Sequence, residues 1–344
     1  MRKIRIIAGS NVEMIMFNAM KHSLSPKSQT AVLVTVVLHF FAISFLPASA
    51  QEVNSGRAAV WQRDTIAEGL IYHSCQGIEP ITGTYQLVNV LEVDMKNPRY
   101  RLKFTMDEKF QTTAEAASRN NALAAINATY EKESVFIRVD GHTFYDIPNP
   151  WVMSTPVRQW RNDGGVYLDK SGRKIRISSD GVGKSYDQTR RIYSRKAKCY
   201  PNIFTSAPVL IDNWQPVGKT FAEHGFDEKQ IQRIHYEDPQ RHQHVRHPRT
   251  AIALTDDNRV LLVTVDGRWP GFAEGMSACE LTTFLEKHFA PRYALNLDGG
   301  GSTTMVIKGK GDPQTGVVNY PTNNRKLDHD GLRATPTHIL VLEN

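Results

Sequence analysis

The stretch ALNLDGGGSTTMVIKG, residues 294–309, places a carboxylate and a bare backbone between two apolar runs. Asp298 ends the first run, three glycines follow it, and three hydroxyl residues (302–304) precede the second run. An ordinary turn needs one or two glycines, whereas three in a row allow another group to approach the backbone closely. Consecutive amides without side chains can form an anion-binding nest, so this stretch predicts a ligand beside Asp298.

The residues before this stretch predict a strand, a helix and a second strand. RVLLVTV (259–265) is an apolar run that ends at Asp266, and YALNL (293–297) ends at Asp298. SACELTTFLEKHF (277–289) has helical spacing and opens with a serine and a glutamate at capping-box positions. If both strands join one sheet through this helix they run parallel, and the two carboxylates emerge at the same ligand-binding edge.

The rest of the chain alternates short apolar runs with turn residues and has few helical patterns. We therefore predict an α+β fold, with a mixed, β-rich sheet and a few helices, in which the strand–helix–strand unit carries the site. The other predicted elements are strands at 85–95 and 99–106 that pair across Asn97-Pro98, a helix capped at Thr112, a strand ending at Asn127, and hairpins turning at Asp140-Gly141 and Ser171-Gly172.

Two polar stretches are predicted to be surface loops. Residues 184–198 carry six Lys or Arg and one acid, a pattern typical of a solvated loop. Residues 224–247 hold five histidines: His224, His235, His242, His244 and His247. A metal site is conceivable there, but QRHQHVRHP has no apolar period, which favours a mobile surface loop.

The first 50 residues have the pattern of a secretory signal. AVLVTVVLHFFAISFL (31–46) is almost wholly apolar, is short for a membrane span, and is followed by the small-residue cleavage pattern PASA. We predict a signal peptide at 1–50, an N-terminal extension at 51–80 and the main domain at 81–344. The mature protein is then periplasmic or secreted, without stable membrane insertion; an uncleaved anchor is the alternative.

Charge and cysteine content restrict the classes of partner. The chain of 344 residues has a formal net charge of +7, and because residues 1–50 hold five Lys or Arg and one acid, residues 51–344 carry +3. This weak positive balance suits an anionic substrate and gives no reason to expect nucleic acid. Cys75, Cys199 and Cys279 lack metal-site spacing and allow at most one disulfide, whose pair the sequence does not select. The sequence names no cofactor.

Several segments together resemble the phosphodiester glycosidase family. They are Asn127 after an apolar run, HPRTAIAL (247–254), VTVDGR (263–268), NLDGGGSTTMV (296–306), and the tail with VVNYP and GLRATPTHILVL. The resemblance covers residues 80–344 and is strongest from 247 to 306. It implies a glycosidase that hydrolyses the sugar–phosphate bond of a glycosyl phosphodiester and releases free sugar and a phosphomonoester. With the predicted signal peptide, this enzyme would be exported.

The resemblance also implies which residues form the cleft. Asp298 is expected to be the carboxylate nearest the anomeric carbon, or the base for water, with Asp266 second. Arg249 and the glycine amides would stabilise the departing phosphate, while a carboxylate stabilises positive charge on the sugar. The residues matched as substrate-binding are Asn127, Asp140, Arg249, Gly299, Gly300, Ser302, Thr303 and Arg333, with Asn319 a weaker match.

One segment departs from the family pattern. The family usually has Asn-Gly-Gly and an aromatic residue where this chain has Asn127-Ala128-Thr129-Tyr130. Side chains at the two glycine positions are expected to crowd a ligand that approaches there.

Three other functions stay open from the sequence. Paired aspartates and nearby histidines permit a metal-dependent phosphodiesterase, which would release a sugar phosphate instead of free sugar. Five tryptophans and the altered Asn127 segment permit a non-catalytic binder of envelope polysaccharide. A structural envelope protein is the third, although it would have no use for the glycine run. The expected partner of the enzyme is a sugar phosphate or a glycopolymer.

Overall fold

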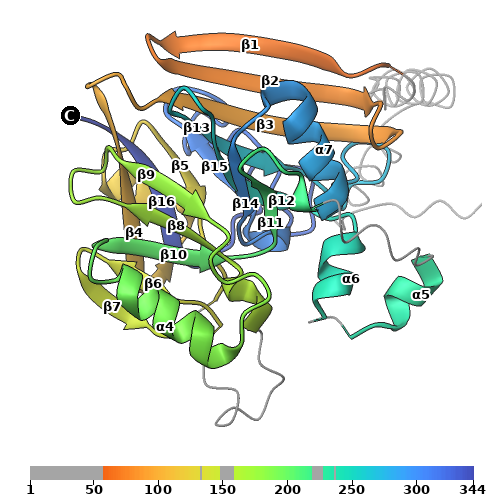
Figure 1. Ribbon diagram of the computed structural model, residues 1–344. Coiled ribbons are helices and arrows are strands. Elements are labelled where there is room, and N and C mark those ends of the chain that lie inside the picture. The colour runs from red at the N-terminus through yellow and green to blue at the C-terminus, as the bar shows by residue number, and fades with distance from the viewer. Residues whose placement is uncertain (1–56, 132–133, 148–158, 219–227, 236–237) are drawn as a thin grey trace, which may run out of the picture. The chain divides into compact units, whose positions relative to one another are not determined.

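The computed structural model describes residues 57–131, 134–147, 159–218, 228–235 and 238–344 (Figure 1). All of the described residues belong to one compact unit. They form three β-sheets and five α-helices, which confirms a β-rich α+β chain. No described helix is both long and apolar enough to cross a membrane. The predicted signal peptide lies outside the described residues.

The largest sheet has seven strands and carries helix α7 on one face (Figure 1). Phe284 and Leu285 of α7 (Ala278–Phe289) are buried in one cluster with Ala253 and Val263 of the sheet. Neighbouring strands are antiparallel throughout. In spatial order they are β1 (Val60–Ala67), β2 (Leu70–Glu79), β3 (Thr84–Asp94), β13 (Arg259–Val265), β12 (Arg249–Leu254), β14 (Tyr293–Asn296) and β11 (Val209–Asp212).

Two smaller antiparallel sheets pack on the other face. One core cluster joins Leu262 of the large sheet to Ile126 and Phe204 of the small ones. The four-stranded sheet has the order β15 (Met305–Ile307), β5 (Ala124–Asn127), β16 (Thr335–Glu343) and β4 (Tyr100–Gln111). The five-stranded sheet has the order β7 (His142–Tyr145), β6 (Ile137–Val139), β10 (Asn202–Ser206), β8 (Gly164–Leu168) and β9 (Ile175–Ser178).

The local signals of the sequence are confirmed at several elements. Helix α3 (Thr113–Arg119) and helix α7 both open with the predicted capping boxes. The two hairpins form as β6–β7 and β8–β9. Polar side chains that cap a helix, and glycines that turn a hairpin, act on residues a few positions away, which is why the sequence reports them directly.

The predicted pairing of the strands at 85–95 and 99–106 is wrong. β3 pairs with β2 and β13, whereas β4 pairs with β16 in a different sheet. The chain crosses from one layer to the other between these strands. Both strands bury apolar side chains in the same core, with Leu91 from β3 and Phe104 from β4 in one cluster, so their sequences do not distinguish the two arrangements.

The expectation of one mixed sheet is also wrong, because the named strands form three sheets with antiparallel pairs only. β13 and β14 are not neighbours; each pairs antiparallel with β12, which lies between them. Two strands antiparallel to the same third strand run in the same direction. Asp266 and Asp298 therefore both follow strands that end at one edge of the sheet, where β12 begins.

Neither polar stretch is simply a loop. Residues 184–198 contain helix α4 (Tyr186–Lys196), which begins with a capping box at Ser185 and buries Thr189 and Tyr193 four residues apart. The histidine-rich stretch contains the short helices α5 (Glu228–Arg233) and α6 (Pro239–His244). The prediction failed because α4 and α6 bury few side chains and are otherwise polar: α4 buries Thr189 and Tyr193, and α6 buries Gln243. His224 lies outside the described residues.

Candidate active site

A cavity of about 160 Å³ opens beside the edge of the large sheet at which β13 and β14 end. Its wall comes from segments that are far apart in sequence: the residues after β5, the 3-10 turn η1 (Gln159–Asn162), helix α6 and the residues between it and β12, the loops after β13 and β14, and the residues before β16. The lining residues are Tyr130, Glu131, Arg161, His242, His247, Arg268, Asp298, Gly299, Gly300, Gly301 and Arg333.

Asp298 is a carboxylate in this wall. Its backbone N–H donates to the Ala128 carbonyl at 2.9 Å, which fixes the start of the glycine run against the end of β5. Burial raises the pKa of Asp298 to about 6, although the Ser302 hydroxyl and the charge of Arg161 act in the opposite direction. The negative charge of Glu131, which shares the cavity, raises this pKa further.

The three glycines allow close approach by specific neighbours. A Cβ atom on Gly299 would lie 2.6 Å from the Pro248 carbonyl oxygen. A Cβ on Gly300, whose φ is +61°, would lie 3.0 Å from Nη2 of Arg268. A Cβ on Gly301 would overlap the Arg333 guanidinium. The glycines thus make room for one carbonyl and two cations.

The open amide nest predicted for this loop is wrong in part. The Gly300 N–H donates to the Pro248 carbonyl at 2.8 Å, and the Ser302 and Thr303 amides donate to carbonyls of Gly299 and Gly300. These three amides are therefore already occupied within the protein. Positive charge for an anion comes instead from guanidinium groups.

Three arginines bring that charge to the cavity. Arg161 is only 7% exposed and lies over the Tyr130 ring, with 4.5 Å between Cζ and the ring centroid. Arg268 donates from Nη1 to the Thr322 hydroxyl at 3.5 Å. Arg333 donates from Nε to Oδ1 of Asn323 at 3.1 Å. Since the lining carboxylates are Asp298 and Glu131, the wall carries one more positive charge than negative.

Two histidines add uncharged rings. The imidazoles of His242 and His247 lie 5.1 Å apart between centroids. Burial holds the pKa of each well below its usual value, and the nearby charge of Arg249 acts in the same direction. Both are therefore neutral at physiological pH. Tyr130 contacts His242 through ring packing and through a 3.4 Å contact between its hydroxyl and Nε2.

Arg249 supports the wall from behind and does not line the cavity. It is fully buried, and burial lowers the pKa of its guanidinium to about 10, so it stays charged at neutral pH. Its Nε donates to the Met276 carbonyl at 2.9 Å, and its Nη2 donates to carbonyls of His242 and Val245. Its placement fixes the end of α6 and hence His242.

Asn127 likewise positions the loop instead of facing the cavity. Its Nδ2 donates to the Asp298 carbonyl at 2.7 Å. Its Oδ1 accepts from the Thr250 hydroxyl at 2.8 Å and from the Thr304 N–H at 3.0 Å. One buried amide thus connects β5, β12 and both ends of the 298–304 loop.

Asp266 is buried beside the segment at 319–320 and does not line the cavity. Its carboxylate accepts from Nδ2 of Asn319 at 2.9 Å and from the Tyr320 N–H at 3.0 Å. Burial raises its pKa to about 7, against the effect of these hydrogen bonds. Asn319 also donates to the Thr303 carbonyl at 3.1 Å, so Asp266 is linked to the glycine loop through one side chain.

The remaining predicted residues divide between the cavity and more distant positions. Gly299, Gly300 and Arg333 line the cavity. Ser302 is not a lining residue, but its side chain hydrogen-bonds to Asp298, which is one. Asp140 is exposed at the tip of the β6–β7 hairpin with a φ of 49° and is not a lining residue.

The side chains that depart from the family pattern do not crowd the cavity. Ala128 and Thr129 are buried, and the Thr129 hydroxyl donates to the Thr205 carbonyl, away from the lining residues. The crowding expected at these two positions is therefore wrong.

Sequence reasoning missed Arg268 and Arg161, and did not place the histidines. Arg268 directly follows Asp266-Gly267, so its motif was already a signal. His242 and His247 lay in the noted histidine cluster, but their burial comes from packing. Arg161 has no local signal.

Among the described residues no group of three or more His, Cys, Asp or Glu could hold a metal ion. None of Cys75, Cys199 and Cys279, all within the described residues, forms a disulfide.

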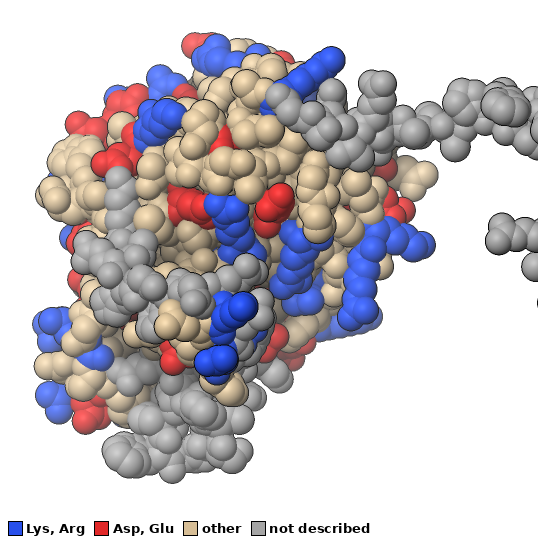
Figure 2. Space-filling view, turned by 90° about the vertical axis from the view of Figure 1, so that its right-hand side faces the viewer, with Lys and Arg blue, Asp and Glu red and all other residues tan. Residues whose placement is uncertain are grey.

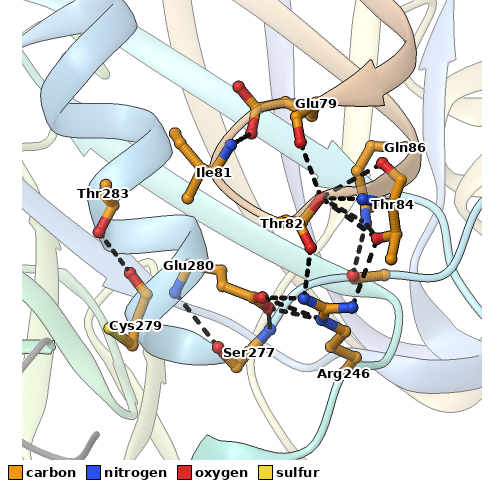
Figure 3. Close-up of polar contacts among 11 residues, drawn as sticks. Glu79, Ile81, Thr82, Thr84, Gln86, Arg246, Ser277, Cys279, Glu280 and Thr283 are labelled. Atoms are coloured by element: carbon orange, nitrogen blue, oxygen red, sulfur yellow. Dashed lines mark hydrogen bonds and ion pairs between the residues drawn. The ribbon is translucent and has the colours of Figure 1, made fainter. Parts of the chain in front are cut away.

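A polar network braces the segment that leads into β12 (Figure 3). Arg246 donates from Nε to both carboxylate oxygens of Glu280, at 2.9 and 3.0 Å, and from Nη2 to the Thr82 carbonyl at 2.8 Å. Glu280 also accepts from the Ser277 N–H at the start of α7, at 2.9 Å. The network holds the residue next to His247 against two other segments.

The surface does not form a continuous basic face on the side shown in Figure 2. There, in the described part of that face, acidic side chains lie next to Lys and Arg side chains. This arrangement agrees with the small net charge of residues 51–344.

Comparison with known proteins identifies the family. Residues 120–342 match the family model described as phosphodiester glycosidase. No curated protein matches the chain. Among solved structures, the chain is similar to the catalytic domain of zebrafish N-acetylglucosamine-1-phosphodiester alpha-N-acetylglucosaminidase auto-inhibited by its pro-peptide, with a TM-score of 0.52, 17% identity, and coverage of 83% of this chain and 88% of that one.

A presumed exported protein of Burkholderia pseudomallei is also similar, with a TM-score of 0.51, 15% identity, and coverage of 75% of this chain and 74% of that one. At such identities the two structures show a shared fold alone. The family model, by contrast, matches more than half of the sequence. This chain belongs to the phosphodiester glycosidase family.

Proposed function

We propose that the protein is an exported hydrolase that cleaves the bond between a sugar and phosphate in a glycosyl phosphodiester. The observation that carries the proposal is one cavity in which Asp298 lies among Arg161, Arg268 and Arg333. A carboxylate suits the positive charge that develops on the sugar, and guanidinium groups suit the negative charge that develops on the departing phosphate. Family membership supports the same reaction and a sugar-containing substrate.

The reaction breaks the bond between the anomeric carbon and the phosphate oxygen. The electron pair of that bond stays on the phosphate, which leaves as a monoester, and the oxygen of water ends on the sugar. Phosphate is a better leaving group than an alkoxide, so protonation of the leaving oxygen matters less. Arg268 and Arg333, which rest on Gly300 and Gly301, would neutralise the charge that the phosphate gains.

Asp298 is proposed as the carboxylate that faces the anomeric carbon or activates the water. Glu131 is the second carboxylate in the cavity wall, whereas Asp266 is not in the wall. We therefore assign the second carboxylate role to Glu131, and assign Asp266 to holding the segment at 319–320. His242, Tyr130 and His247 form an uncharged part of the wall that can pack against a sugar ring.

Export is proposed from the leader sequence. The apolar run at 31–46 and the small residues after it match a secretory signal. The similarity to a presumed exported protein supports this assignment. A periplasmic or secreted enzyme would meet glycopolymers that carry phosphodiester links.

Product analysis tests the proposed reaction. Purified full-length protein is incubated with a panel of sugar phosphodiesters that differ in the sugar, and the products are separated by anion-exchange chromatography. Free sugar together with a phosphomonoester is the expected result. Sugar phosphate together with an alcohol would show cleavage at phosphorus and overturn the proposal, and binding without products would favour a polysaccharide-binding protein.

Incubation in ¹⁸O-labelled water identifies the bond that breaks. Cleavage at carbon places the label in the free sugar and leaves the phosphomonoester unlabelled. Label in the phosphate would contradict attack at the anomeric carbon, even if the products had the expected masses otherwise.

A further inference from the structure

A second, larger cavity lies at the opposite end of the seven-stranded sheet. Its volume is about 740 Å³, and its walls come from β1, β2, β3, the turn between β12 and β13, the start of β13, and the end of α7. The seven residues of β13 separate this turn from Asp266, a span of roughly 20 Å at the usual rise of a strand. The second cavity is therefore distinct from the one that holds Asp298.

An exposed tryptophan forms the aromatic part of this cavity. Trp61 lies on the edge strand β1 and is 37% exposed. Its ring stacks on Phe284 at 5.6 Å with an interplanar angle of 21°, and contacts Phe289 at 5.8 Å. Since two rings of α7 hold the indole in place, it offers a flat apolar surface whose orientation is set before any ligand arrives.

A chain of paired charges forms the polar part. Glu92 contacts Nε2 of His73 at 3.1 Å and also pairs with Arg259. Arg259 in turn donates from Nε to Asp257 at 2.7 Å. The two partners of Glu92 hold the pKa of its carboxyl below the usual value, the hydrogen bond to His73 being the larger effect. These donors and acceptors alternate along the wall and are held in fixed positions.

The balance of charge selects the class of ligand. The wall contains Arg63 and Arg259 against Glu92, Asp256 and Asp257. It thus lacks the excess of guanidinium groups found around Asp298, and a phosphate would meet nearby carboxylates. Hydroxyl groups, which both donate and accept hydrogen bonds, suit such a wall, and the apolar face of a sugar ring suits an indole.

We propose that this second cavity binds a neutral oligosaccharide, with Trp61 as the stacking surface and the Glu92–Arg259–Asp257 series as the hydrogen-bonding wall. The inference does not depend on the reaction at Asp298, because binding requires no turnover. If the substrate is a glycopolymer, a neutral segment bound here would raise the effective concentration of its phosphodiesters near the other cavity.

Calorimetric titration of the full-length chain tests the proposal. The probes are maltotriose, cellotriose and N,N′,N″-triacetylchitotriose, and the variants are Trp61→Ala, Asp257→Ala and the matched control Trp214→Ala. Trp214 is 46% exposed and lies beneath the guanidinium of Arg292, but it is not in the cavity wall. We expect at least one trisaccharide to bind the wild type and Trp61→Ala to weaken that binding by roughly tenfold.

Asp257→Ala guards against a folding artefact, because Asp257 is an exposed turn residue whose side chain contacts only the wall residues Thr255 and Arg259 among the interactions of its carboxylate. It is expected to weaken binding as well, while Trp214→Ala leaves the dissociation constant unchanged. The proposal is overturned if no probe binds the wild type, or if Trp61→Ala and Trp214→Ala behave alike. It is also overturned if light scattering shows that Trp61→Ala only alters association between copies of the chain.

Discussion

At the scale of single residues, the central side chain is Asp298, a carboxylate beside an excess of guanidinium groups. We predict that Asp298→Asn lowers turnover on the order of 10²-fold or more, because the amide keeps the shape and loses the charge. The measurement is kcat on a sugar phosphodiester, with thermal melting as the control for folding. Wild-type turnover in this variant would disprove the catalytic role, and a collapsed melting temperature would show a structural one.

The raised pKa of Asp298 predicts how activity depends on pH. Burial raises this pKa to about 6, so the carboxylate is protonated below that value. If the charged form acts, kcat/KM should fall as pH is lowered through about 6. A profile that stays flat between pH 4.5 and 7.5 would contradict this assignment.

The stability of the fold should change in the opposite direction. The folded pKa of Asp298 and that of Asp266, about 7, both exceed the ordinary value of 3.8, so the folded state binds more protons between these limits. This contribution to stability is complete below the unfolded pKa and is lost as pH rises through the folded values. Urea unfolding at pH 4.5 and 7.5, for wild type and for Asp266→Asn, measures it; the variant should show the smaller loss.

Gly300 provides a test of the arginine contact. Gly300 and Gly183 have φ angles of +61° and +66°, but only Gly300 has a neighbour, Arg268, at the place of a Cβ. Alanine at either position should cost stability by about 1 kcal/mol from backbone strain. Only Gly300→Ala should also raise KM, because it displaces the Arg268 guanidinium. An equal change in KM for both variants would show that strain alone is responsible.

At the scale of elements, Arg246 connects the start of α7, the turn before β3 and the segment that enters β12 (Figure 3). Its pair with Glu280 is partly buried, with side-chain exposures of 34% and 18%. Arg246→Ala should lower the free energy of unfolding by about 2 kcal/mol, since the Glu280 charge loses a two-point partner.

Arg99 is the matched control for that variant. Its pair with Glu343 is exposed at both side chains, 49% and 46%, so Arg99→Ala should leave the free energy of unfolding almost unchanged. Denaturant unfolding measures both. If the two variants lose the same stability, the network at Arg246 does not brace the fold as proposed.

At the scale of the whole molecule, the segment assigned from sequence to an N-terminal extension adds two strands to the large sheet. β2 pairs with β3 along its length and buries Leu70 and Cys75. A chain that begins at Ile81 would expose the edge of β3 and part of the core. We predict that it is insoluble or melts at a much lower temperature than a chain that begins at Gln51. Equal melting temperatures would support the boundary near residue 80 as a true domain limit.

The amino-acid sequence by itself determined the features that depend on close neighbours along the chain. Capping pairs such as Ser277 and Glu280, hairpin glycines, and the strand runs that end at Asp266 and Asp298 are of this kind. The motifs between residues 247 and 306, in their order along the chain, also indicated the family. Such features can be recognised in the sequence because the interacting groups are only a few residues apart.

Only the tertiary structure decided which side chains share the cavity. Arg161, His242 and Arg268 come from three separate segments and line the same cavity as Asp298. Asp266 and Arg249 belong to the strongest sequence motifs, yet their side chains lie behind the cavity wall. There they form hydrogen bonds with amides and carbonyls. Strand pairing depends on apolar surfaces that are similar in many strands. The sequences of β13 and β14 therefore do not indicate that β12 lies between them. Contacts between distant segments depend on how the layers of the fold pack, and the pattern of residues along the chain does not specify that packing.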